Sequence, residues 1–105
     1  MRNKIRFSAY AQRDIADLHD YLSAHSTKTA DAIIADLERI LMTDIAINPV
    51  VYGWFYLLHE PFRARLFRVS RRTQFWIIYE YSEATRLVLV HRLWNASRNP
   101  SAFEL

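Results

Sequence analysis

The sequence predicts an α+β fold: an N-terminal strand, a two-helix hairpin, and then a three-stranded antiparallel meander whose sheet the helices cover. Apolar residues recur at helical spacing over the first half of the chain, and three strand-like runs follow between Phe62 and Leu93. The polar segment Ser82–Thr85 has the length that joins antiparallel neighbours. Each helix and the sheet have an apolar face to bury, so we expect the hairpin to pack across the sheet. The 105 residues, 51% hydrophobic, suit one domain.

The first predicted elements are a short strand over Asn3–Phe7 and a helix that begins at Ser8. A serine hydroxyl can accept a hydrogen bond from a free backbone N–H of the first turn, which makes Ser8 a good N-cap. The helix runs to about His25, and its apolar face comprises Ala11, Ile15, Leu18 and Leu22. Its carboxylates are expected on the opposite, solvated face, without a chemical role. They are Asp14, Asp17 and Asp20.

A second helix is predicted after the polar segment His25–Thr29, which offers several possible caps. Its apolar stripe ends near Asn48–Pro49 and comprises Ala30, Ile33, Ile34, Leu37, Ile40, Leu41 and Ile45. The following segment, Pro49–Pro61, holds Gly53, the one glycine of the chain, and two of its three prolines. We interpret it as an ordered loop whose aromatic residues plug one end of the core.

Three strands are predicted in the second half of the chain. Phe62–Val69 alternates arginine with apolar residues, which indicates one wet and one buried face and places Arg63 and Arg65 on the same face. Thr73–Tyr81 is apolar on both faces, as a central strand covered on both sides should be. Arg86–Leu93 is the third strand.

Charge is distributed unevenly along the chain. Residues 1–62 contain 6 Lys/Arg and 8 Asp/Glu, whereas residues 63–105 contain 8 and 3, and five of those arginines lie between Arg63 and Arg72. The sheet half is therefore basic. Such a face suits an anionic partner, either nucleic acid or an acidic protein segment, although a merely solvated strand face is the alternative.

Several classes of function are disfavoured. The chain has no cysteine, its four histidines show no zinc spacing, and it has no glycine-rich phosphate loop or nucleophile elbow, so we expect no metal and no cofactor. Its longest apolar run is far shorter than the roughly 20 residues of a membrane span. No apolar segment of a secretory signal follows the charged N-terminus. We therefore expect a cytoplasmic protein without membrane contact.

The remaining candidate side chains are arginine, histidine and aromatic residues of the sheet half. Arginines can clamp phosphates by bidentate bonds, and the candidates are Arg63, Arg65, Arg68, Arg92 and Arg98. Aromatic rings can stack on bases but are more often core residues, and the candidates are Trp76, Tyr79 and Trp94. His91 shares a strand face with Leu89 and is either a general base or a structural edge histidine.

Four segments of the chain are distinctive when taken together: FSAYAQRDIADLHDYL after the first strand, FRARLFRV, FWIIYEY and the ending WNASRNP. Together they resemble the RelE/ParE superfamily of bacterial toxins from type II toxin–antitoxin modules. Members often carry a Ser or Thr cap followed by A-x-x-D-L-x-x-I-x-x-Y, and Ala11, Asp14 and Tyr21 fall in step with it. The resemblance covers nearly the whole chain and implies the same α+β fold.

Three departures from the family patterns weaken the RNase interpretation. RelE-branch RNases usually carry an arginine at the position occupied here by Trp76, and ParE-like relatives often have histidine where this chain has Asn95. Phe103 is the nearest aromatic residue to the late catalytic tyrosine or histidine of the RNases. An asparagine cannot exchange a proton near neutral pH. The resemblance thus implies a non-enzymatic poison of DNA gyrase.

The resemblance also implies partners and sites. A cognate, ParD-like antitoxin would neutralise the toxin in a hetero-oligomer. Because the sheet half is basic, we expect an amphipathic, acidic segment of the antitoxin to contact Arg63, Arg65 and Arg68. The target would be contacted through Trp94, Asn95, Arg98 and Asn99. The alternative is a metal-independent endonuclease that cuts mRNA on the ribosome through Arg63, Arg65, Arg68, His91 and Arg92. A third possibility is a non-toxic binding module on the same fold.

Overall fold

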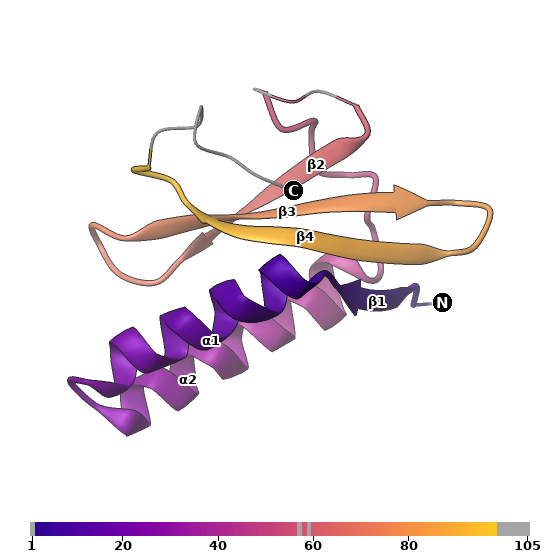
Figure 1. Cartoon of the computed structure of the whole chain (residues 1–105). Coiled ribbons are helices and arrows are strands. Elements are labelled where there is room, and N and C mark those ends of the chain that lie inside the picture. Colours follow the sequence, from indigo (N-terminus) through magenta and orange to yellow (C-terminus); the bar gives the residue numbers. More distant parts are fainter. Residues whose placement is uncertain (1, 57, 59, 99–105) are drawn as a thin grey trace.

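The computed structural model describes residues 2–56, 58 and 60–98, and its elements follow the predicted order (Figure 1). They are β1 (Lys4–Phe7), α1 (Ala9–Ser23), α2 (Thr27–Ile40), the π-helical turn η1 (Leu41–Ile45), β2 (Phe62–Arg68), β3 (Gln74–Ser82) and β4 (Leu87–Asn95). The two helices lie side by side along one face of the sheet. The predicted α+β architecture, with a helix hairpin over a sheet, is confirmed.

The sheet has the strand order β1-β4-β3-β2. β2, β3 and β4 form the predicted antiparallel meander, and β1 joins β4 in parallel, so β1 and β2 are the two edge strands. The register between β3 and β4 shifts after Ile78, which lies opposite Arg92, whereas Tyr79 lies opposite Val90. His91 is therefore the extra residue of a β-bulge, a feature that re-aims a side chain.

Side-chain caps define where the helices begin. Ser8 Oγ accepts from Ala11 N at 3.0 Å and donates to His91 O at 2.7 Å, so the predicted cap also ties α1 to β4. Ser26 caps α2 by accepting from Thr29 N at 3.2 Å. At the end of η1, Ala46 N donates to Leu41 O at 2.8 Å, five residues back, which closes the π-helical turn.

Apolar residues cover both faces of the sheet. The main core lies between the helices and the sheet and includes Leu18, Leu37, Ile45, Phe67, Ile77, Tyr79, Val88 and Leu93. A smaller core on the opposite face contains Phe55, Ala64, Ile78 and Trp94. Phe55, from the loop after η1, packs in this second core and not at one end of the main core as predicted, whereas Trp54 and Tyr56 of that loop stay exposed. No helix of the described residues is long and apolar enough to cross a membrane.

Candidate functional site

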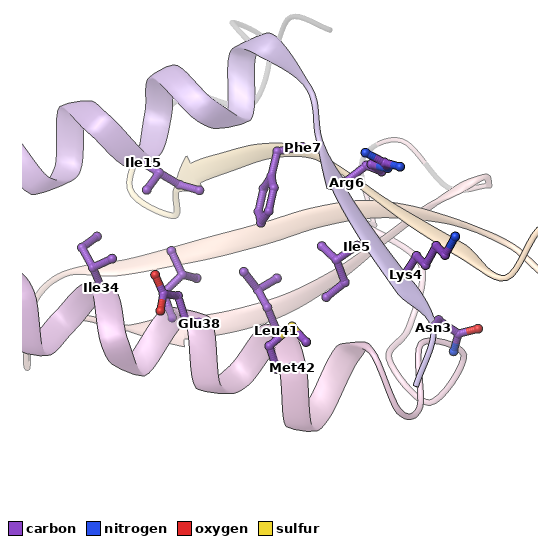
Figure 2. Close-up of a pocket in the computed structure, with 11 residues that line it drawn as sticks. Asn3, Lys4, Ile5, Arg6, Phe7, Ile15, Ile34, Glu38, Leu41 and Met42 are labelled. Atoms are coloured by element: carbon purple, nitrogen blue, oxygen red, sulfur yellow. The ribbon is translucent and has the colours of Figure 1, made fainter. Parts of the chain in front are cut away.

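A groove of about 780 Å³ opens between β1 and α2, which we call the β1 groove (Figure 2). Its walls are Asn3, Lys4, Ile5, Arg6, Phe7, Ile15, Ile34, Leu37, Glu38, Leu41 and Met42. Figure 2 shows Ile5 and Phe7 of β1 and Ile15 of α1 turned towards the space above α2. Lys4, Arg6 and Glu38 are exposed. The groove is thus apolar inside and charged outside.

The position of β1 gives this groove a second property. β1 lies at the edge of the sheet and pairs with β4 only. An edge strand presents backbone N–H and C=O groups that an extended segment of another chain can pair with. The alternation of charged Lys4 and Arg6 with apolar Ile5 and Phe7 is the sequence signal for such an edge. The predicted partner contacts included no residue of this strand.

Arg63 and Arg65 do share a face of β2, but that face turns towards the helices. They lie opposite Tyr79 and Ile77, which are main-core residues. The predicted wet face of β2 is therefore wrong, because the helices cover one side of the strand and the loop carrying Phe55 covers the other.

Internal contacts hold both guanidinium groups. Arg63 Nη1 donates to Val50 O at 3.3 Å and to Tyr52 O at 2.7 Å, and its Cζ lies 3.7 Å from the centroid of the Trp54 ring. Arg65 Nη2 lies 2.8 Å from Asp44 Oδ2. A partner at these arginines would have to displace such contacts. By contrast, the third predicted contact residue, Arg68, is exposed, as are Arg71 and Arg72 in the following turn.

Arg92 is buried in an ion pair with Asp14. Its Nε and Nη2 donate to Asp14 Oδ2 and Oδ1 at 2.7 and 3.0 Å, and Leu93 N also donates to Oδ2 at 3.0 Å. The two side chains are 11% and 14% exposed. The expectation that Asp14 lies on a solvated helix face is wrong. Asp14 follows Ala11 by three residues and precedes Leu18 by four, so it belongs to the buried face.

His91 lies at the bulge, partly buried beside β2 and β3. Its Nε2 is 2.9 Å from Glu80 Oε1, and its ring packs edge-on against Phe62 with centroids 5.0 Å apart. Since Glu80 lies opposite both Phe62 and Leu89, His91 shares the face of Leu89, as predicted. A carboxylate that holds an imidazole in this way can support proton transfer.

The residues proposed for phosphate cleavage do not converge on one surface. Arg63 and Arg65 face the helices, His91 lies with Glu80 on the opposite face, and Arg92 is paired with Asp14 on α1. Arg68 is exposed near the end of β2. Within the described residues, no group of three or more His, Cys, Asp or Glu side chains is placed to hold a metal ion.

The two aromatic candidates of β3 are core residues to different degrees. Tyr79 is completely buried and its hydroxyl donates to Pro49 O, so the ring is not available for stacking on a base. Burial raises the pKa of the Tyr79 phenol well above its ordinary value, and nearby Arg63 opposes that rise. Trp76 is half-buried and packs edge-on against Phe55, with ring centroids 6.0 Å apart.

The residues expected to contact a target lie at the end of β4. Trp94 is only 2% exposed, and Arg98 lies above its ring, with Cζ 4.6 Å from the centroid. Asn95 Oδ1 accepts from Ser97 N and Oγ at 2.9 and 2.8 Å. Trp94 thus supports Arg98 from beneath and has little surface of its own. Asn99, the fourth predicted contact residue, and Phe103 lie outside the described residues.

Arg98 and Asn95 line a second groove of about 570 Å³, which we call the helix-end groove. It lies between the hairpin end of the two helices, where α1 ends and α2 begins, and the turn between β2 and β3. Its lining combines carboxylates, hydroxyls and apolar side chains: Asp14, Asp17, Leu18, Tyr21, Leu22, Thr29, Ile33, Val69, Ser70, Thr73, Phe75, Leu93, Asn95 and Arg98. Tyr21, which is 66% exposed, stands at the surface of this groove. A groove lined by this mixture of charged, polar and apolar side chains suits a protein surface as its ligand better than a single phosphate group.

Comparisons with known proteins identify the class of molecule. The fold is shared with the crystal structure of the toxin–antitoxin complex RelBE2 from Mycobacterium tuberculosis, at a TM-score of 0.52 and 16% identity over 90% of this chain and 99% of that chain. The family model of the ParE toxin of the type II toxin–antitoxin system parDE matches residues 5–100. The chain therefore belongs to the ParE toxin family. No curated protein matches the sequence significantly.

Proposed function

We propose that this chain is a growth-arresting toxin that acts by binding DNA gyrase and is neutralised by a cognate antitoxin. The observation that carries the non-enzymatic part is the division of the candidate catalytic residues between separate surfaces. Arg63, Arg65 and Arg92 are held by internal contacts, and Trp76 stands where a strand arginine is expected. Loss of one aligned donor to a developing charge costs about 2.7 to 4 kcal/mol in a catalytic site. A binding poison needs only a complementary surface.

The β1 groove is the proposed antitoxin site. An antitoxin segment would add a strand to the free edge of β1 and place apolar side chains between β1 and α2. Lys4 and Arg6 stand outside this groove, so carboxylates on the outer side of the segment would complement them. An acidic segment that folds as it binds fits this arrangement. Arg68 lies on β2, at the opposite edge of the sheet, so it remains a proposed contact for a second segment of the same partner.

The helix-end groove is the proposed target site. Arg98 is exposed, and the buried Trp94 ring beneath it limits the positions of its guanidinium group. An arginine that is positioned by a buried aromatic residue at a mixed apolar and polar groove is typical of a protein-binding hot spot.

The test is a pair of assays on one preparation of the purified chain. We expect inhibition of gyrase supercoiling and no cleavage of mRNA on translating ribosomes. Codon-positioned cuts would establish the endonuclease instead, and inactivity in both assays would refute the gyrase proposal. Before this, induced expression of the chain alone should arrest bacterial growth. Co-expression of the cognate antitoxin, which we expect the neighbouring reading frame to encode, should restore growth.

One contact favours the endonuclease as the second candidate. His91 Nε2 and Glu80 Oε1 are 2.9 Å apart, as a histidine base oriented by a carboxylate requires. If this pair is catalytic, His91→Gln removes mRNA cleavage and toxicity together while gyrase supercoiling stays unaffected throughout. If the pair is only structural, His91→Gln changes the stability of the chain but leaves unchanged which of the two targets the chain acts on.

A further inference from the structure

A small aromatic slot lies beside β2, at the sheet edge opposite β1. Its volume is about 200 Å³, and its lining consists of Gly53, Trp54, Phe55, Tyr56, Ala64 and Trp76. The loop wall is tied to the strand, because Phe55 N donates to Phe62 O at 2.7 Å and Ala64 N donates to Gly53 O at 3.2 Å. These bonds pair the loop with β2 through an isolated antiparallel β-bridge between Trp54 and Arg63. The slot is therefore largely preformed.

The surroundings of the slot are unusually apolar for an exposed loop. Two rings of the slot lining itself are exposed, since Trp54 is 43% and Tyr56 63% exposed. Exposed apolar residues gathered in one place mark interaction sites more often than isolated ones do. Trp, Tyr and Arg are also the residues enriched in protein-binding hot spots.

Size and charge define the kind of ligand. A volume of about 200 Å³ is below the roughly 300 Å³ at which small-molecule sites begin, and suits one side chain. The Arg63 guanidinium lies over Trp54, and the described residues that line the slot include no carboxylate. Arg63 points to the face of β2 opposite to that of Ala64, and its Nη1 already donates to Val50 O and Tyr52 O. This arginine therefore supplies positive charge from behind the Trp54 ring and does not offer a free guanidinium group to a phosphate.

We propose that the slot receives a single aromatic side chain of a partner protein, presented between carboxylates on an acidic segment. The apolar lining of the slot, beside an Arg63 whose Nη1 is already bonded, favours a protein ligand over a nucleic acid strand. β1 and β2 are opposite edges of the sheet, so the slot is separate from the β1 groove. The proposal goes beyond the gyrase and antitoxin assignments, because it depends on neither.

Gly53 supplies a sharp test. Gly53 lines the slot, and a Cβ added there would meet nothing within 4 Å, so a larger residue at this position should narrow the slot without a clash at its Cβ. We would titrate the ¹⁵N-labelled full chain with the blocked peptide acetyl-Asp-Trp-Asp-amide and follow the indole N–H signals of Trp54 and Trp76 by NMR. Acetyl-Asp-Ala-Asp-amide and acetyl-Lys-Trp-Lys-amide are the matched controls for ring and charge.

The acidic tryptophan peptide should shift the Trp54 and Trp76 signals, the alanine peptide should not, and the lysine peptide should bind several-fold more weakly. Gly53→Leu should weaken binding of the acidic tryptophan peptide at least tenfold while the thermal midpoint stays near that of the wild type. Trp54→Ala, which removes an exposed wall of the slot, should weaken binding as well and replaces Gly53→Leu as the test if that variant folds poorly.

Unchanged binding in both variants, or no shift in the wild type, would overturn the proposal. Shifts of the same signals by oligouridylate without a response to the peptide would also overturn it, in favour of a base-binding site. Because the titration uses no toxicity assay, its outcome is independent of the gyrase and antitoxin tests.

Discussion

Asp14 of α1 and Arg92 of β4, 78 residues apart in the sequence, form a two-bond ion pair in which both carboxylate oxygens accept from the guanidinium group. Asp14 also accepts from Leu93 N, a backbone donor of β4. The pair thus joins the first helix to the last strand along the part of β4 that extends past β1. The removal of one partner from such a pair leaves a buried charge uncompensated.

We therefore expect Asp14→Asn to lower the free energy of unfolding by about 3 kcal/mol, since breaking a buried ion pair typically costs that much. Urea denaturation of the purified chain measures this change. Asp17→Asn, an exposed carboxylate on the same helix, is the control and should stay within about 0.5 kcal/mol of the wild type. Equal effects of the two substitutions would mean that the pair adds little to stability.

The buried phenol of Tyr79 predicts a dependence of stability on alkaline pH. Its pKa is raised by burial in the folded state and lies near 10 in the unfolded chain. Between these two values the folded state holds the proton that the unfolded state releases, so stability is full below about pH 10 and falls as the pH rises above it. Unfolding free energies measured from pH 8 to pH 11 should show this decline.

Tyr79→Phe is the matched variant for that pH series. It should lose about 1 to 3 kcal/mol at pH 7, because the buried Pro49 carbonyl loses its donor. Above pH 10 it should lose less additional stability than the wild type does. Parallel curves for the two proteins would show that other groups, such as lysines, cause the alkaline decline.

Met42 tests the proposed antitoxin site. It lines the β1 groove and is 42% exposed, so Met42→Asp should leave the fold intact and place a carboxylate where an acidic segment is expected to bind. We expect at least tenfold weaker binding of the cognate antitoxin in calorimetry, because burial of an unpaired charge at an interface is costly. Ala35→Asp, an exposed position of α2 outside the groove lining, is the control. Equal affinity of all three proteins would place the antitoxin elsewhere.

Arg98 tests the proposed target site. Arg98→Ala removes a cation that lies over the Trp94 ring at an exposed position, so stability should fall by less than about 1 kcal/mol. Inhibition of gyrase supercoiling should weaken at least tenfold, with growth arrest weakened in parallel. Arg86→Ala, in the exposed β3–β4 turn, controls for loss of positive charge alone. Retention of full inhibition by Arg98→Ala would remove this arginine from the target surface.

For the proposed target site, the single substitution Arg98→Ala is a sharper test than a deletion of all residues after Asn95. Such a deletion removes Ser97, which bonds to Asn95, together with the arginine that covers the buried Trp94. Loss of toxicity would then combine a lost contact with a disturbed strand end. A thermal midpoint measured beside the toxicity assay separates the two effects.

The sequence by itself determined the order and type of the elements, because these depend on contacts between near neighbours in the chain. The spacing of Ala11, Ile15, Leu18 and Leu22 predicted α1, and Ser8 was recognisable as its N-cap from its place before the first apolar residue. The aromatic and β-branched run Thr73–Tyr81 predicted a central strand, which β3 is. The sequence resemblance to the toxin superfamily rested on the same local patterns.

Only the tertiary structure decided which charged side chains are free. Arg63 and Arg65 alternate with apolar residues as a solvated face would, yet the loop and helices that cover β2 come from distant segments, and local periodicity does not report them. Asp14 lies on the apolar stripe of α1, but its buried position is tolerable only because Arg92 arrives from β4. The β1 groove likewise exists because β1 pairs in parallel with β4 and so lies at the edge of the sheet beside α2. This pairing joins residues more than 80 positions apart. Solvation, pairing and edge exposure are properties of the assembled chain, because each depends on which distant group fills the neighbouring space.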